Sequence, residues 1–265
     1  MKMAATLSID LCTQQLGQDG NGRNQWQPRT EAASWSVDET ALLLCDVWNN
    51  HHCVAAVERL EAMIPRMGEV VTALRNRGVQ IIHAPSDTME FYEGTPARMR
   101  VLDAPEVTPP PDLEREDPPQ PCDKSDSSDT PTLDKAHFDS DKENGAPWTR
   151  QHPGIDIDQQ RDAISDHGPS VYSFMEQSGI ENVLIMGVHT NMCVLNRTFA
   201  IKQMVRWGKQ VALIRDLTDA MYNPARAPYV SHDEGTQLII AYIEKFWCPT
   251  TTIEDILNCG NGLTK

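Results

Sequence analysis

Short apolar runs, each followed by a polar residue, recur along this 265-residue chain and limit most strongly how it can fold. Runs of this length and composition are typical of strands buried on both faces, as in a parallel sheet. The clearest runs are Ala41–Cys45, Val79–Ile82, Val183–Met186 and Val211–Ile214. Two weaker strands are predicted at Thr6–Leu11 and Ile155–Ile157.

Segments with helical spacing lie between the runs. Between Ile64 and Leu74 apolar residues recur three and four positions apart. Pro65 suits the first turn of this helix and Gly78 its end. Further helices are expected over Ser170–Gln177, Thr198–Trp207 and Glu234–Trp247. Because strands and helices alternate, we predict an α/β fold: a doubly wound, mostly parallel, six-stranded Rossmann-like sheet with helices on both faces.

The charge balance limits the partners. The chain has 23 basic and 38 acidic residues, a net charge of −15, which argues against binding to nucleic acid or to an anionic membrane. No apolar run approaches the roughly 20 residues that cross a bilayer, and the N-terminal residues make a poor signal peptide. We therefore expect a cytoplasmic protein with a small-molecule substrate. The 7 cysteines are odd in number and scattered, which disfavours a disulfide framework.

Two segments depart from the regular pattern. Residues 1–40 are polar and are expected to form a loosely packed N-terminal arm, with residues 41–265 as a single domain. Residues 101–150 form an insertion that holds 9 of the 18 prolines, 13 acidic and 5 basic residues. That composition favours an extended surface segment. Both ends of the insertion, however, attach at the carboxyl edge of the sheet, so we predict that part of it is ordered over the active site, with Trp148 and Arg150 as its inner anchors.

The strand ends are where chemistry is expected, because ligands of open α/β sheets bind at the carboxyl ends of the strands. Cys193 lies in GVHTNMCV (Gly187–Val194), where a strand turns into a helix. A helix N-terminus favours a thiolate and offers N–H groups to an oxyanion. The alternative is a small buried apolar side chain. Asp46 ends the first apolar run and is either the base for that thiol or a capping or ion-pair partner.

Three stretches resemble the isochorismatase-like cysteine hydrolases, a superfamily that includes nicotinamidases and N-carbamoylsarcosine amidohydrolase. They are LLLCDVWNNHH (Leu42–His52), GIENVLIMGVHTNMCV (Gly179–Val194) and KQVALIRDLTDAM (Lys209–Met221). The resemblance implies that Asp46 is the catalytic base and Cys193 the nucleophile. It also implies a cis peptide bond at Val188–His189, which directs the backbone N–H groups of Met192 and Cys193 at the oxyanion.

One catalytic residue of the family is missing. The resemblance implies a Lys on the strand before the nucleophile, but Gly154–Asp166 contains none. Gln159 or Gln160 falls nearest, and Arg161 or Arg150 is the candidate replacement, although Arg cannot transfer a proton. The missing ammonium group would lower the pKa of the thiol and keep the Asp charged.

The metal motif of the nicotinamidases is also broken, since Asp87 is followed by Thr88 and Met89 rather than by a His two positions on. We therefore expect neither a metal nor another cofactor. The substrate pocket is expected to contain Trp48, His51, His83, Arg150 and Asn191, although Trp48 could equally belong to the core.

These features favour a cysteine-dependent hydrolase that cleaves a small amide, ureido or related acyl compound through a thioester. Two alternatives stay open: a vinyl ether hydrolase of the isochorismate type, which does not need the Cys, and a binding or scaffold protein that has lost catalysis. We expect a homo-oligomer, a dimer or tetramer, with Trp207, Phe246 and Trp247 as apolar material for its interface.

Overall fold

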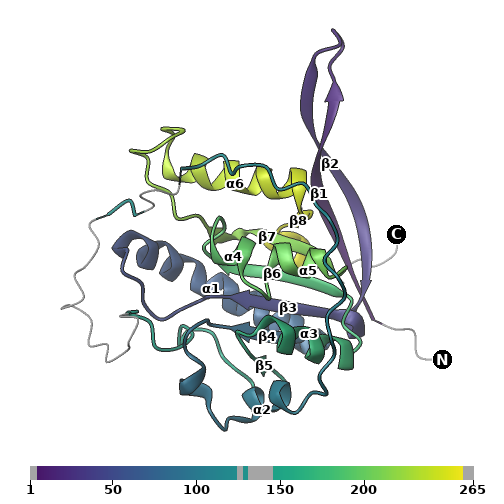
Figure 1. Ribbon diagram of the computed structural model, residues 1–265, viewed down its shortest axis with the longest axis vertical. Helices are drawn as coiled ribbons and strands as arrows, with labels where there is room; N and C mark the ends of the chain where they lie inside the picture. The colour runs from purple at the N-terminus through teal and green to yellow at the C-terminus, as the bar shows by residue number, and fades with distance from the viewer. Residues whose placement is uncertain (1–4, 124–127, 131–145, 259–265) are drawn as a thin grey trace.

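An eight-stranded sheet forms the centre of the protein, in a computed structural model that describes residues 5–123, 128–130 and 146–258 (Figure 1). The strand order is β2-β1-β8-β7-β6-β3-β4-β5; β3 to β8 pair in parallel with one another, whereas β1 is antiparallel to both β2 and β8. The strands are β1 (Thr6–Gln18), β2 (Asn24–Ser36), β3 (Thr40–Cys45), β4 (Gln80–Ala84), β5 (Ala163–Ile164), β6 (Asn182–Val188), β7 (Gln210–Asp219) and β8 (Thr250–Thr251). The α/β, mostly parallel prediction is confirmed, but the predicted number of six strands is wrong.

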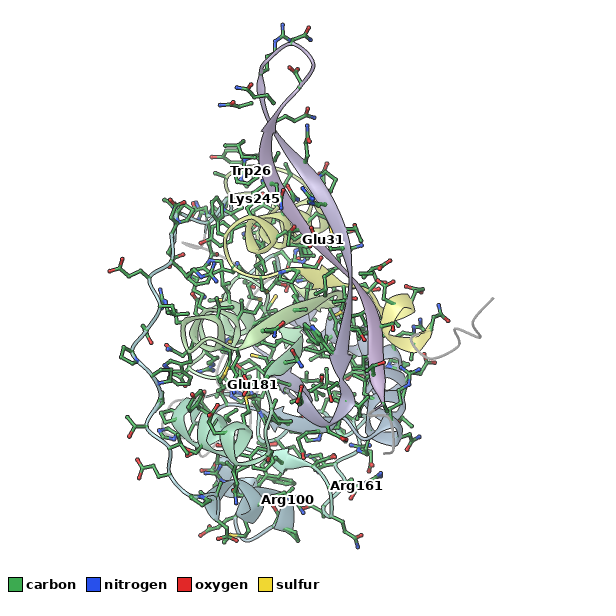
Figure 2. All side chains as sticks on the ribbon, turned by 90° about the vertical axis from the view of Figure 1, so that its right-hand side faces the viewer. Trp26, Glu31, Arg100, Arg161, Glu181 and Lys245 are labelled. Carbon is green, nitrogen blue, oxygen red and sulfur yellow. The ribbon has the colours of Figure 1, made fainter. Side chains whose placement is uncertain are left out.

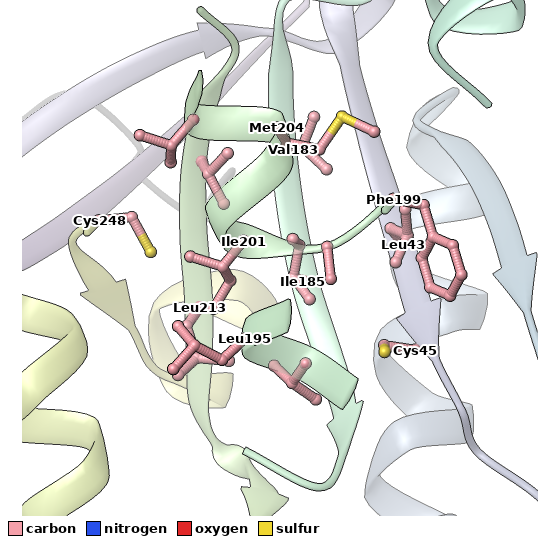
Figure 3. Packing of buried hydrophobic residues seen from close by; sticks show 14 of the residues in the cluster. Leu43, Cys45, Val183, Ile185, Leu195, Phe199, Ile201, Met204, Leu213 and Cys248 are labelled. Carbon is pink, nitrogen blue, oxygen red and sulfur yellow. The ribbon is translucent and has the colours of Figure 1, made fainter. Parts of the chain in front are cut away.

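Helices cover both faces of this sheet. One hydrophobic core packs α3, α4, α5 and α6 against the sheet, and a second core packs α1 and α7 against the other face. Figure 3 shows part of the first core, where Leu195 and Ile201 lie against Ile185 and Leu213. The helices are α1 (Val54–Arg77), α2 (Pro96–Leu102), α3 (Gly168–Gln177), α4 (Cys193–Asn196), α5 (Ile201–Arg206), α6 (His232–Phe246) and α7 (Ile253–Asn258), with 3-10 turns at Val37–Glu39 and Met89–Tyr92.

Several element boundaries differ from the prediction. Helix α1 starts at Val54, so Pro65 lies inside it rather than in its first turn. The predicted strand at Ile155–Ile157 is irregular backbone, and the short edge strand β5 follows it instead. Strand β8 was missed, because two threonines carry no apolar pattern. No described helix is long and apolar enough to cross a bilayer.

The N-terminal segment is a long β-hairpin rather than a loosely packed arm. Strands β1 and β2 pair in antiparallel register along their whole length. Leu7, Ile9 and Trp35 at the base of the hairpin are buried in the second core. The distal part extends away from the body of the molecule (Figures 1 and 2). Both faces of this part are largely exposed, so its residues are polar and the two-residue alternation of a half-buried strand is absent.

The described first half of the insertion is an extended segment that packs along helices. Its backbone bonds to α5 where the Leu113 N–H donates to the Arg206 carbonyl, at 2.9 Å. Further along, Asp117 accepts hydrogen bonds from Lys202 (2.8 Å) and Tyr242 (2.6 Å). This half is therefore ordered on the helical face, and its end reaches the turn after β6, where the Gln120 side-chain amide donates to the Asn191 carbonyl at 3.2 Å.

The aromatic residues expected at an oligomer interface are mostly covered within the chain. Trp247 is buried, and its indole N–H donates to the Tyr242 hydroxyl. Phe246 makes an edge contact with Trp26 of the hairpin, at 5.8 Å between ring centroids. Figure 2 places Trp26 and Lys245 together where the hairpin passes α6.

Candidate active site

Asp46 occupies the carboxyl end of β3, as predicted from the apolar run before it. Its backbone is left-handed, with φ of 51°, and its side chain is fully buried. One carboxylate oxygen accepts the Ser86 N–H at 2.7 Å, and the other accepts the Arg197 Nε–H at 2.9 Å. Burial raises the pKa of Asp46, while Arg197 and Ser86 oppose the rise. A carboxylate removed from water in this way is a stronger proton acceptor than an exposed one.

Cys193 begins α4 and its thiol interacts with the Asp46 carboxylate as a hydrogen-bond partner. The close approach of β6 to β3 depends on Gly187, whose φ is 129°. A Cβ there would lie 2.0 Å from the Cys45 carbonyl oxygen. Only glycine fits this contact, and it places the turn that carries Cys193 directly beside the residue after Cys45. The structure thus brings together the two residues that the sequence singled out.

The thiol is held protonated in this arrangement. Burial first, and then the Asp46 charge, raise the pKa of Cys193 to about 12, although Arg197 acts in the opposite direction. Burial and the Asp46 charge thus outweigh any stabilisation of the thiolate by the helix N-terminus, which the sequence had led us to expect. The physical reason is that α4 has only 4 residues, so few peptide dipoles add up, and an adjacent carboxylate outweighs them. A base has to remove the proton before the sulfur can attack.

Arg197 is the cation that contacts Asp46, and the sequence analysis missed it. It follows α4 directly, four residues after Cys193. Residues with this spacing lie on one side of a helical turn. Its Nη2 also lies 3.5 Å from a carboxylate oxygen of Asp87, so the guanidinium bridges a buried and a half-exposed carboxylate. The basic residue one helical turn after Cys193 was the signal available in the sequence.

The two arginines proposed as replacements for the family Lys lie elsewhere. The Arg150 guanidinium stacks over the Phe91 ring, at 5.3 Å from its centroid. Arg161 pairs with Asp158 at 2.6 Å. Neither contact is to Asp46, so the suggestion that one of these residues supplies the charge is not supported.

The turn before Cys193 contains the cis peptide bond at Val188–His189 that the family resemblance implied. The Met192 N–H donates to the His189 carbonyl at 3.0 Å, so it is engaged within the turn rather than directed at a ligand. For the Cys193 N–H, no backbone acceptor is present among the described residues. Of the two expected oxyanion donors, the geometry favours Cys193 alone.

Asn191 is fully buried and holds the same turn in place. Its side-chain amide donates to the Met221 carbonyl at 2.7 Å, and its side-chain oxygen accepts the Met221 N–H at 2.9 Å. Because both ends of the amide are used in this way, Asn191 connects the turn after β6 to the segment after β7. Its expected place in the substrate pocket does not agree with these contacts.

His83 also differs from expectation. Its ring is fully buried at the end of β4, with its two nitrogens 2.9 Å from the Gln151 side-chain oxygen and 3.0 Å from Asp162. Arg75 pairs with the same Asp162 carboxylate at 3.0 Å. His83 thus belongs to a buried polar network rather than to the pocket, because both ring nitrogens already have partners.

An aromatic group lies beside the Asp46 turn. Trp148, from the end of the insertion, stacks on Trp48 at 4.2 Å and on His51 at 5.6 Å between ring centroids. The indole N–H of Trp48 donates to the carbonyl of Ser86, the residue whose N–H holds Asp46. The expected anchoring role of Trp148 agrees with this stack. Trp48 is almost completely buried, and its hydrogen bond to Ser86 supports the Asp46 turn.

His51 and His189 form the polar side of a cavity next to this aromatic group. The cavity is also lined by Trp48, Leu60 and Val188. Burial lowers the pKa of His51 to about 2 and that of His189 to about 4, so both rings are neutral at physiological pH. His51 Nδ1 accepts the Cys53 N–H at 3.1 Å, which agrees with a neutral ring. Within the described residues, no group of three or more His, Cys, Asp or Glu is arranged to hold a metal ion.

A second charged cluster lies around Asp219, at the end of β7. Its carboxylate accepts hydrogen bonds from Arg59 and from His232, each at 2.8 Å. Asp129, from the insertion, pairs with the same Arg59 at 2.7 Å, and the Thr130 hydroxyl accepts the Ala55 N–H at the start of α1. The insertion is thus fixed to the body at this cluster and again at Trp148.

Comparison with known proteins gives a family and a fold. Residues 40–227 match the model of the isochorismatase domain. A cysteine hydrolase from Pseudomonas syringae pv. phaseolicola has a similar structure, with a TM-score of 0.54 and 14% sequence identity over 84% of this chain and 92% of that one. An isochorismatase-like structure from Burkholderia xenovorans has a TM-score of 0.51 and 14% identity over 85% of this chain and 89% of that one. A search of curated proteins gave no significant match. At these identities the structures show a common fold, and the domain match supports a hydrolase.

Proposed function

This chain belongs to the isochorismatase family, and we propose that it is a cysteine-dependent hydrolase acting on a small amide, ureido or related acyl compound. The juxtaposition of the Cys193 thiol with the buried Asp46 carboxylate is the observation that supports this function most directly. A nucleophile beside a base that is itself held by a third group is the arrangement used in covalent catalysis. Here Ser86 and Arg197 hold the base.

The first half of the reaction forms a thioester. Asp46 accepts the thiol proton while the Cys193 sulfur attacks the carbonyl carbon of the substrate. The backbone N–H of Cys193 donates to the resulting oxyanion. The C–N bond then breaks, and protonated Asp46 returns the proton to the leaving amine, so that the carboxylate is regenerated.

The second half releases the acid. Asp46 takes a proton from water, and the oxygen of that water attacks the thioester carbonyl. The C–S bond breaks, and the leaving sulfur of Cys193 recovers the proton from Asp46. Every proton transfer goes through Asp46, since Arg197 cannot give up its proton.

Trapping of the thioester tests this function. The protein is incubated with a panel of small amides and ureido compounds, quenched in acid and digested, and the Cys193 peptide is examined by mass spectrometry. We expect an acyl adduct on Cys193 that is absent from Cys193→Ser, together with loss of turnover in that variant. Turnover that survives Cys193→Ser would favour vinyl ether hydrolysis of the isochorismate type, which uses no thioester.

Selective alkylation distinguishes an enzyme from a scaffold protein. Cys45, Cys53, Cys122 and Cys248 are buried, whereas Cys12 and Cys193 are partly exposed. In a background with Cys12→Ser and Cys259→Ser, label on Cys193 that a substrate suppresses supports an enzyme. Uniform labelling that no member of the panel suppresses supports a scaffold. The same preparation gives the mass in solution, for which we expect a homo-oligomer.

A further inference from the structure

Arg197 connects the buried Asp46 carboxylate to the half-exposed Asp87 carboxylate. We propose that Arg197 is the positioning residue that replaces the missing family Lys, and that Asp87 moderates its charge. The role in catalysis rests on the proposed hydrolase function, whereas the electrostatic effect on Cys193 does not. The inference depends on two contacts: Arg197 Nε to Asp46 at 2.9 Å, and Arg197 Nη2 to Asp87 at 3.5 Å.

The geometry separates the two ends of the guanidinium. Its inner nitrogen contacts the fully buried Asp46, and its outer nitrogen contacts Asp87, whose side chain is 43% exposed. Arginine donates in fixed directions from a planar group, so holding both carboxylates also fixes the orientation of Asp46 toward the thiol. Asp87 has a left-handed backbone, with φ of 62°, two residues after the Pro85 carbonyl that accepts from Thr88. This bend places its carboxylate next to Arg197.

Two charged groups act on the Cys193 thiol, a carboxylate and a guanidinium. The thiol faces Asp46, Arg197 and the buried Cys45 thiol. The Asp87 carboxylate lies 3.5 Å from the outer nitrogen of Arg197. When Asp46 accepts the thiol proton, the negative charge moves from the carboxylate to the sulfur, and Arg197 stays positive throughout. Loss of Arg197 therefore disfavours the thiolate, while loss of Asp87 favours it, because Asp87 offsets part of the positive charge.

The opposite effects of losing Arg197 and losing Asp87 on the ionisation of Cys193 provide the test. The rate of iodoacetamide alkylation of Cys193 is measured from pH 6 to pH 10 in the Cys12→Ser, Cys259→Ser background, which needs no substrate. A change of one pH unit in the midpoint of ionisation changes the rate about tenfold at pH 7. We expect about tenfold slower alkylation for Arg197→Gln, a rate near that of the parent for Arg197→Lys, and about two- to fivefold faster alkylation for Asp87→Asn.

The control is Arg161→Gln, which removes one positive charge where Arg161 pairs with Asp158. We expect no change in its alkylation profile. Circular dichroism and the urea midpoint establish that each variant is folded, and Arg197→Lys keeps the test valid if Arg197→Gln does not fold. An unchanged rate in Arg197→Gln, or equal directions for Arg197→Gln and Asp87→Asn, would overturn the proposal. If the alkylation rates change in the expected directions but no thioester is trapped on Cys193, the hydrolase function is overturned and the electrostatic role of Arg197 stands.

Discussion

Replacement of Asp46 by Asn should change two measurable properties of Cys193 in opposite directions. Burial and the Asp46 charge raise the pKa of the thiol from an ordinary 9.0 to about 12. At pH 7 such a thiol is ionised about a thousand times less than an ordinary one. The resting site thus stores a proton on sulfur, and turnover depends on a base that removes it during attack.

In Asp46→Asn the negative charge beside the sulfur disappears, and Arg197 is left to stabilise the thiolate. We expect the midpoint of Cys193 alkylation to move to lower pH, so that alkylation at pH 7 becomes at least about tenfold faster. Turnover should fall by about 100-fold or more, because an amide cannot accept the proton and general base catalysis contributes about 10²–10⁴. In this variant the fraction of Cys193 present as thiolate would rise while the turnover rate falls.

Two assays on the same preparation check this prediction: the pH profile of iodoacetamide alkylation, and steady-state turnover of a substrate found by thioester trapping. Asn is nearly isosteric with Asp, so the Ser86 N–H keeps an acceptor, and the urea midpoint serves as a folding control. Slower alkylation in Asp46→Asn would show that Asp46 does not set the ionisation of the thiol. Retained turnover would show that another group is the base.

Four further outcomes are expected. Gly187→Ala should destabilise the fold by about 3 kcal/mol or more, measured by urea unfolding, since its Cβ would meet the Cys45 carbonyl at 2.0 Å. Trp148→Ala should lower stability by about 1–3 kcal/mol and raise KM, since it removes the stack at the Asp46 turn; unchanged values of both would contradict this. Burial disfavours the charged form of His232, but Asp219 outweighs burial and raises the pKa of His232. The ion pair with Asp219 therefore stabilises the fold fully below about pH 6.5, and this stabilisation is lost as pH rises through the folded-state pKa of His232. His232→Gln should therefore flatten the stability profile above pH 6.5, which pH-dependent unfolding measures. Light scattering at micromolar concentration should show a homo-oligomer, and a monomer mass would refute that expectation.

Residues next to a strongly patterned strand could be placed from the sequence. Asp46 and Cys193 follow apolar runs that are typical of buried strands, and the carboxyl ends of adjacent parallel strands meet at one edge of a sheet. Trp148 could be placed beside the site for a similar reason, since it comes shortly before the chain returns to the sheet. In each of these cases the neighbouring sequence is sufficient to place the residue at the edge of the sheet.

The direction of a side chain depends on neighbours that are distant in sequence. His83 and Asn191 lie near the predicted strand ends, but Asp162, Gln151 and Met221 take up their polar atoms. The apolar pattern contains no information on which partner satisfies a buried polar group. The same limit applies to the insertion, whose acidic residues indicate a surface segment without indicating that Lys202 holds it.

The sequence by itself determined the parallel α/β sheet and the positions of Asp46 and of the turn that carries Cys193, because burial of apolar runs and the spacing of turns are local properties of the chain. Tertiary structure alone decided that Arg197 is the partner of Asp46 and that the thiol is protonated at rest. Both depend on electrostatic interactions over a few ångströms between residues far apart in the sequence (151 positions for Asp46 and Arg197), which acquire their strength only when β3 and β6 pair and water is excluded from between them.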